Sequence, residues 1–287
     1  MKKIKLVLII FIIFLITGCY EKTSIENANI RVSSYPIEYV TKRLYGEHSD
    51  IKSIYPDNMD EDYVVSDKLI TDYSSSNLFI FNGNEDNEND YVYKMFNENK
   101  NLKIIDATGS LTYTNKIEEL WLDPMNLLTI ANNIKKGFKE YISMTYLNND
   151  IDKNYEKLKL ELIQLEADYR EVANRANNKT IIVGNDLFLY LSKYGINVIS
   201  LEESDNFTKK NLYIAEELIQ KGEIKYIYVK KGEEINKNIN DLKDKYNIEI
   251  IELNSLYTIT EDDRKGNNDY LTIMYNNLEL LKQQLYA

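Results

Sequence analysis

The sequence predicts an α/β protein of two lobes, each with a mostly parallel sheet flanked by helices, joined by one long bridging helix. Three observations carry this prediction. Strand-like and helix-like segments alternate through both halves of the chain, and such alternation is typical of βαβ units. Between the halves, one long amphipathic segment replaces the alternation. A chain of 287 residues also exceeds what one compact core usually contains, so two lobes are expected.

Residues 30–150 are predicted to form the N-terminal lobe. Short β-type runs alternate here with helical segments, and Ser66 is a suitable N-cap for the helix that follows it. This spacing favours a mostly parallel sheet. The predicted elements are strand 30–34, helix 37–44, strand 51–55, helix 67–73, strand 78–81, helix 90–97 and strand 102–106.

The segment 151–177 is predicted to be one helix that lies along both lobes. Its apolar residues are spaced alternately by three and four, which places them on a single helical face. A coiled coil is the competing interpretation, but sustained heptads need more length than this segment offers. The residues of the stripe are Tyr155, Leu158, Leu162, Leu165, Tyr169, Val172 and Ala176.

Residues 178–287 are predicted to form a second α/β lobe. Strand and helix patterns alternate again, and Gly195 is a stop signal for the first helix. The predicted strands are 180–183, 197–200, 226–229 and 249–252, and the predicted helices are 186–193, 210–221, 234–246 and 270–285.

The N-terminus has the layout of a signal peptide. Three lysines precede an apolar run that ends in Ile16-Thr17-Gly18-Cys19. The run is too short to span a bilayer as a mature helix, and its end has the pattern of a lipobox. We therefore expect removal of residues 1–18, attachment of diacylglycerol to Cys19, and a polar tether over residues 19–29 at the outer face of a membrane. An uncleaved signal anchor is the alternative.

Charge and motifs exclude several classes of function. Beyond residues 1–18 the chain has 32 basic against 46 acidic residues, a formal net charge of −14, which argues against nucleic acid or an anionic bilayer surface as a partner. The sequence contains no Gly-rich phosphate loop, no paired cysteines, no Gly-x-Ser-x-Gly turn and no His-Glu-x-x-His motif. We expect a binding protein rather than an enzyme.

Four segments resemble, in order and at fitting separations, the zinc- and manganese-binding lipoproteins of metal ABC importers. The resemblance covers nearly the whole chain after the signal peptide. It implies a monomeric solute-binding component that captures a divalent zinc or manganese ion between two lobes for an ABC permease and its ATPase. The segments are Leu78-Phe79-Ile80-Phe81-Asn82-Gly83, Leu120-Trp121-Leu122-Asp123-Pro124-Met125-Asn126, Asp186-Leu187-Phe188-Leu189-Tyr190-Leu191 with Tyr194-Gly195, and Asp269-Tyr270-Leu271 to Met274 with Asn277-Leu278.

The same resemblance implies where a metal ion would bind, although the ligands differ from those of the family. That family uses three histidines, or two histidines and a glutamate, with an acidic group from the second lobe. The matching positions here are Glu61, Glu119 and Asn185, and Glu261 is the candidate for the fourth position. The only histidine, His48, falls in a connection where the family places no ligand.

Three interpretations of this altered site stay open. In the first, oxygen ligands hold a harder cation such as manganese, calcium or magnesium. In the second, the cleft takes a cationic or amine solute, because Glu61 and Glu119 would otherwise repel each other. In the third, the metal site has degenerated and the protein serves adhesion or another role at the cell surface.

Overall fold

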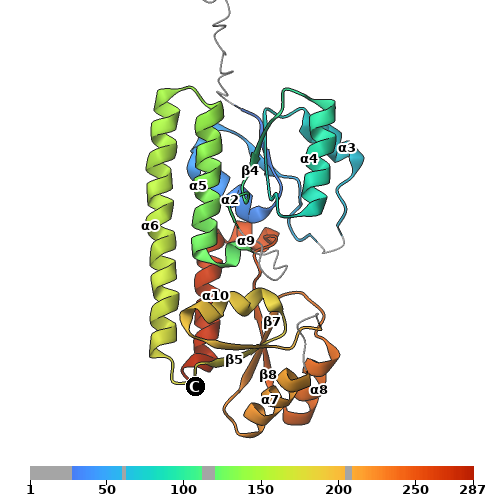
Figure 1. Ribbon diagram of the computed structural model, residues 1–287, viewed down its shortest axis with the longest axis vertical. Helices are drawn as coiled ribbons and strands as arrows, with labels where there is room; N and C mark the ends of the chain where they lie inside the picture. Colours follow the sequence, from blue (N-terminus) through green and yellow to red (C-terminus); the bar gives the residue numbers. More distant parts are fainter. Residues whose placement is uncertain (1–27, 60–62, 112–119, 204–208) are drawn as a thin grey trace, which may run out of the picture.

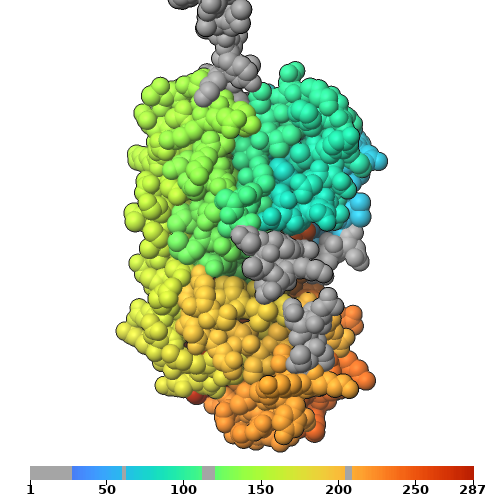
Figure 2. Space-filling model, in the orientation of Figure 1, coloured from blue at the N-terminus to red at the C-terminus, as the bar shows by residue number. Residues whose placement is uncertain are grey.

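The computed structural model describes residues 28–59, 63–111, 120–203 and 209–287. Cys19 and the predicted signal peptide lie outside these ranges. Two lobes are stacked along the long axis, and helices α5 and α6 run down one side (Figure 1). Figure 2 shows the surface of α6 continuing from the upper lobe to the lower one. Within the described ranges, none of the helices has the length and apolar character needed to cross a membrane.

The N-terminal lobe contains a four-stranded parallel sheet in the order β2-β1-β3-β4. Alternation along β3 produces two layers, because Leu78 and Ile80 join the core under α2, whereas Phe79 and Phe81 join the cluster under α3 and α4. The strands are β1 (Ile30–Val32), β2 (Ile51–Ser53), β3 (Leu78–Phe81) and β4 (Lys103–Asp106). The helices are α2 (Tyr35–Tyr45), the short 3₁₀ helix η1 (Gly46–His48), α3 (Asp67–Ser74) and α4 (Asp86–Glu98).

The C-terminal lobe repeats this plan with the order β6-β5-β7-β8, again all parallel. Ile181 and Val183 face the core shared with α6 and α10, while Ile182 faces the layer of α7 and α8. The strands are β5 (Thr180–Val183), β6 (Asn197–Ser200), β7 (Tyr226–Lys230) and β8 (Glu249–Leu253). The helices are η3 (Asp186–Tyr194), α7 (Lys209–Gln220), α8 (Lys237–Tyr246), α9 (Glu261–Lys265) and α10 (Tyr270–Leu285).

Most predicted elements agree closely with the observed ones, and the main differences are in helix type and in helix ends. Strands 180–183 and 197–200 and helix 270–285 begin and end where the sequence predicted. The first helix of the second lobe is a 3₁₀ helix rather than an α-helix, and it stops at Gly195 with φ 80°. Helix α4 begins at Asp86, earlier than predicted, because its acidic first turn suits the positive end of the helix dipole.

Two long helices run side by side, and the second of them joins the lobes. Helix α5 (Pro124–Tyr141) begins at the Asp123 cap, whose Oδ1 accepts from Met125 N at 2.8 Å. Helix α6 (Thr145–Arg175) starts earlier than the predicted 151 and ends before the predicted 177. It buries the predicted stripe from Tyr155 to Val172, while Ala176 lies just beyond its end and is partly buried. It contacts α2 in one lobe and α10 and η3 in the other, so a single hydrophobic core continues through both lobes. The two-lobed fold with one bridging helix is confirmed.

Candidate functional site

The two sheets point their carboxyl ends at each other. Segments that follow β2 meet segments that follow β8: the ring centroids of Tyr55 and Tyr257 lie 6.3 Å apart, and Asn58 N donates to Ile259 O at 3.0 Å. In open parallel sheets, ligands bind beyond the carboxyl ends of the strands, where the strand order reverses. The seam between the lobes is therefore where the fold places a ligand.

Trp121 joins the two lobes at this seam. Its side chain is almost completely buried, and its indole Nε1 donates to Ser255 O at 2.8 Å. In return, the Tyr270 hydroxyl donates to Trp121 O at 2.6 Å. Ser255 and Tyr270 both belong to the C-terminal lobe, so this short segment before α5 fixes one lobe against the other.

The strand ends of the N-terminal lobe form a buried polar cluster. Ser33 and Ser34 follow β1, Asn82 follows the adjacent β3, and Glu88 reaches the same place from α4. One oxygen of the fully buried Glu88 accepts from Asn82 N at 2.6 Å. Among the described residues, its Oε1 and the hydroxyls of Ser33 and Ser34 have no partner with hydrogen-bond geometry. Burial, reinforced by Glu85, raises the pKa of the Glu88 carboxyl well above its usual value.

The strand ends of the C-terminal lobe form an acidic cavity of about 220 Å³. Asn185 lies at its wall, where Oδ1 accepts from Lys230 N at 2.8 Å and Nδ2 donates to Glu233 at 2.6 Å. Burial raises the pKa of Glu202, and the nearby carboxylates of Asp186 and Glu233 add to the effect. The cavity is lined by Gly184, Asn185, Glu202, Glu203, Val229, Glu233, Glu234, Ile235, Asn236 and Ile239.

Only part of the predicted metal site can be placed. Glu61 and Glu119 lie outside the described residues, as does Cys19. Asn185 is buried at the carboxyl end of β5, and Glu261 is a mostly exposed residue that opens α9 and pairs with Lys265 at 3.1 Å. Within the part of the chain that the structure describes, no three His, Cys, Asp or Glu side chains come together in a set that could hold a metal ion.

A cross-lobe ion pair at the seam was missed by the sequence reasoning. Arg264 of α9 contacts Glu38 of α2 and Asp57 of the segment after β2. No local signal marks these residues, because Arg264 stands in a run of charged residues of the kind that usually forms a solvated surface.

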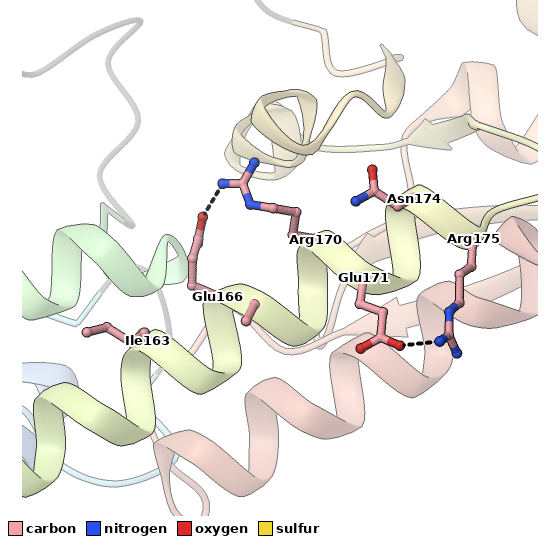
Figure 3. A pocket seen from close by; sticks show the side chains of 7 residues that line it. Ile163, Glu166, Arg170, Glu171, Asn174 and Arg175 are labelled. Atoms are coloured by element: carbon pink, nitrogen blue, oxygen red, sulfur yellow. Dashed lines mark hydrogen bonds and ion pairs between the residues drawn. The ribbon is translucent and has the colours of Figure 1, made fainter.

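A shallow groove on the outer face of α6 is a separate feature (Figure 3). Two ion pairs run along it, Glu166 with Arg170 at 2.9 Å and Glu171 with Arg175 at 2.8 Å. Glu166 also accepts from Lys193 at 2.8 Å, and thereby ties the bridging helix to the C-terminal lobe. With acids and bases balanced along it, the groove lacks the concentrated charge of the strand-end cavity.

Comparison with known proteins gives a consistent result. The family model for the periplasmic zinc-uptake complex component A, ZnuA, matches residues 30–284. The zinc-binding lipoprotein AdcA of Streptococcus pneumoniae is 24% identical over 312 residues, an alignment that covers 99% of this chain. The chain spans only 61% of the length of that relative.

Solved structures show the same fold. The Zn(II)-bound ZnuA-like domain of S. pneumoniae AdcA has a TM-score of 0.74 and 23% identity, covering 91% of this chain and 100% of the domain. The laminin-binding protein Lmb of Streptococcus agalactiae, described as bifunctional with adhesin and metal transporting activity, has a TM-score of 0.74 and 20% identity, covering 90% of this chain and 99% of that one. At these identities the likeness concerns the fold alone.

Proposed function

We propose that this chain, which belongs to the ZnuA family, captures a divalent metal ion between its two lobes and delivers it to an ABC permease and its ATPase. The observation that carries the proposal is the meeting of two parallel sheets at their carboxyl ends, with the family match over residues 30–284. The names of the relatives support a metal as the solute, since AdcA is a zinc-binding lipoprotein. In this proposal the protein is a binding component rather than an enzyme.

Glu61, Glu119, Asn185 and Glu261 are the proposed ligands. The positions of described neighbours support the first two. The ring of Tyr63 lies 6.3 Å from that of Tyr55 at the seam, and Trp121, two residues after Glu119 in the sequence, is bonded across the seam. An amide oxygen has two lone pairs, so Asn185 can accept from Lys230 N and still offer a ligand atom.

Oxygen ligands favour manganese among the ions in the range of the family. Carboxylate and amide oxygens suit Mn²⁺, Ca²⁺ and Mg²⁺, whereas imidazole favours zinc. The proposed site has no imidazole, so we expect it to bind zinc more weakly than a histidine site would. The carboxylates near Asn185, including Glu202 and Glu233, add negative potential that attracts a cation.

The proposal places the protein at the outer face of a membrane. Diacylglycerol on Cys19 would anchor the chain, since two acyl chains hold a protein stably whereas one is marginal. Residues 19–29 would then serve as the tether. A monomer suffices for this role, because the site lies between two lobes of a single chain.

A thermal-shift series tests the proposal. The processed lipoprotein, stripped of metal in detergent, is titrated with Mn²⁺, Zn²⁺, Ca²⁺ and Mg²⁺, because a ligand that binds only the folded state raises the melting temperature. We expect Mn²⁺ to raise the melting temperature most, and Zn²⁺ to do so only at higher concentration. Both increases should be lost in Glu61→Gln and in Glu119→Gln.

The matched control is Glu47→Gln, which removes the same charge from an exposed residue of η1. It should leave the metal response unchanged. Absence of stabilisation by any of the four ions in the wild type would contradict the proposal and leave a non-metal solute or an adhesive role as the better account.

A further inference from the structure

Arg264 forms an ion pair with two carboxylates of the opposite lobe. Its Nη1 and Nη2 donate to the two oxygens of Glu38 at 3.1 and 2.8 Å. Its Nε and Nη2 donate to the two oxygens of Asp57 at 2.5 and 2.8 Å. Arg264 lies in the C-terminal lobe, while Glu38 and Asp57 belong to the N-terminal lobe, so one guanidinium makes two fork-like contacts across the seam.

The surroundings of Arg264 keep this contact charged and well ordered. The side chain of Glu38 is only 4% exposed and needs a cation, and Lys42 supplies a second one from the same helix. Burial opposes the charge on Arg264, but hydrogen bonds with Asp57 and Glu38 outweigh it and raise the pKa of the guanidinium. The guanidinium also stacks over the ring of Tyr35, 5.7 Å from its centroid.

Two further hydrogen bonds cross the same stretch of the seam, one between backbone groups and one from a side-chain hydroxyl to a backbone carbonyl. Asn58 N donates to Ile259 O at 3.0 Å, and Thr258 Oγ1 donates to Pro56 O at 3.2 Å. Together with the Arg264–Asp57 ion pair, these two hydrogen bonds join the segment after β2 to the segment after β8 and to α9, so they set the distance between the carboxyl ends of the two sheets.

We propose that Arg264 is a positioning residue for metal capture, holding the strand ends of the two lobes at their binding separation before the ion arrives. This inference rests on the proposed function. An ion that enters a preformed site does not have to order the lobes, and such preorganisation contributes to affinity. Because Arg264 stays charged at all physiological pH values, the lobes remain bridged in the metal-free protein.

The test compares Arg264→Met with the wild-type lipoprotein in detergent. Met keeps the apolar stem and removes the charge and the fork. The matched control is Arg175→Met, which removes the same charge from an exposed residue that pairs with Glu171 along α6. The Kd for Mn²⁺ is measured by competition with a chromophoric chelator, and the dissociation rate is measured by stopped flow. Acrylamide quenching of the fluorescence of Trp121, the only tryptophan of the sequence, reports how accessible the seam is to solvent.

We expect Arg264→Met to weaken Mn²⁺ binding about tenfold, within the usual range for coupling between sites, mainly through faster dissociation. Trp121 in the metal-free variant should be quenched more readily, because the seam opens. Added salt should reduce the difference in Kd between the wild type and Arg264→Met, since it screens the ion pair that only the wild type has. The Kd of Arg264→Lys should lie between those of the wild type and Arg264→Met, because an ammonium group keeps the positive charge but cannot make the paired hydrogen bonds of a guanidinium.

Two failures can be told apart. If the wild type binds Mn²⁺ and Arg264→Met binds it equally well, the positioning role is overturned while the proposed function stands. If the wild type binds none of the four ions, the proposed function and this inference both fall. Should Arg264→Met not fold, Arg264→Lys and Asp57→Asn provide the same comparison with smaller expected losses.

Discussion

The strand ends of the two lobes share one topology but differ in how far their carboxyl groups are open to solvent. Both sheets reverse strand order between a central pair, β1 and β3 in one lobe and β5 and β7 in the other. In the N-terminal lobe this point is closed around the fully buried carboxyl of Glu88. In the C-terminal lobe it opens into a cavity lined by four glutamates. The fold determines where a site can be, and the local side chains determine whether it is dry or attracts a cation.

Asn185→Ala is expected to have the largest effect on this comparison. The change leaves Lys230 N without its acceptor, and an unpaired buried polar group costs about 1–3 kcal/mol. Glu233 also loses a donor but is exposed, so water can replace it. We expect the free energy of unfolding in urea to fall by this amount in the metal-free protein. The control is Asn174→Ala, on the outer face of α6 in the groove of Figure 3.

An equal stability of the two alanine variants would contradict the structural role of Asn185. If Asn185→Ala were destabilised without metal but bound Mn²⁺ normally, Asn185 would be a structural residue of the acidic cavity rather than a ligand.

Glu88→Gln is expected to stabilise the protein, in contrast to Asn185→Ala, and by a smaller free energy. Because the pKa of Glu88 is raised in the folded state, the wild type is most stable below the unfolded pKa of Glu and loses stability as the pH rises through the folded pKa. Gln cannot ionise, its oxygen can still accept from Asn82 N, and its amide can donate to a partner such as the Ser33 hydroxyl. A gain of about 1 kcal/mol would raise the melting temperature by roughly 2–4 °C.

The measurement is the difference in melting temperature between wild type and Glu88→Gln from pH 4 to pH 8. It should widen in favour of the variant as the pH increases. A difference that stays constant would mean that the folded protein compensates the Glu88 charge and that the N-terminal strand ends are not electrically isolated.

The fold was largely predictable because its signals are periodic. The apolar stripe of α6 and the buried run of β3 repeat at helix and strand spacing, and Ser66 acts as the cap that local chemistry suggested. The long-range polar chemistry was not predictable. Arg264 and Asp57 are 207 residues apart, and no periodicity connects residues so distant in the sequence.

The candidate site shows the same division. Asn185 could be located from its place before a helix, but its bonds to Lys230 and Glu233 depend on how β5 and β7 pair. Glu88 stands in a polar, acid-rich run that resembles a solvated surface in the sequence, yet it is fully buried. Burial of a single polar residue depends on tertiary packing, which local pattern does not contain.

Glu202→Gln is expected to have the smallest effect on the free energy of unfolding. Its salt dependence distinguishes most clearly between the open and the closed strand-end cluster. Burial raises the pKa of Glu202, and Asp186 and Glu233 add to it, so neutralisation should stabilise the metal-free protein as the pH rises, with the same sign as at Glu88. Water reaches this half-buried carboxyl and reduces the gain to a few tenths of a kcal/mol.

Raising the salt concentration from 0.05 to 0.5 M should remove the stability gain of Glu202→Gln, because ions screen exposed charges. The gain of Glu88→Gln should remain, because solvent does not reach Glu88. Chemical unfolding of both variants at two salt concentrations measures this contrast. Equal salt sensitivity would show that the two strand-end clusters are hydrated alike, and the distinction between a closed and an open strand-end site would be wrong.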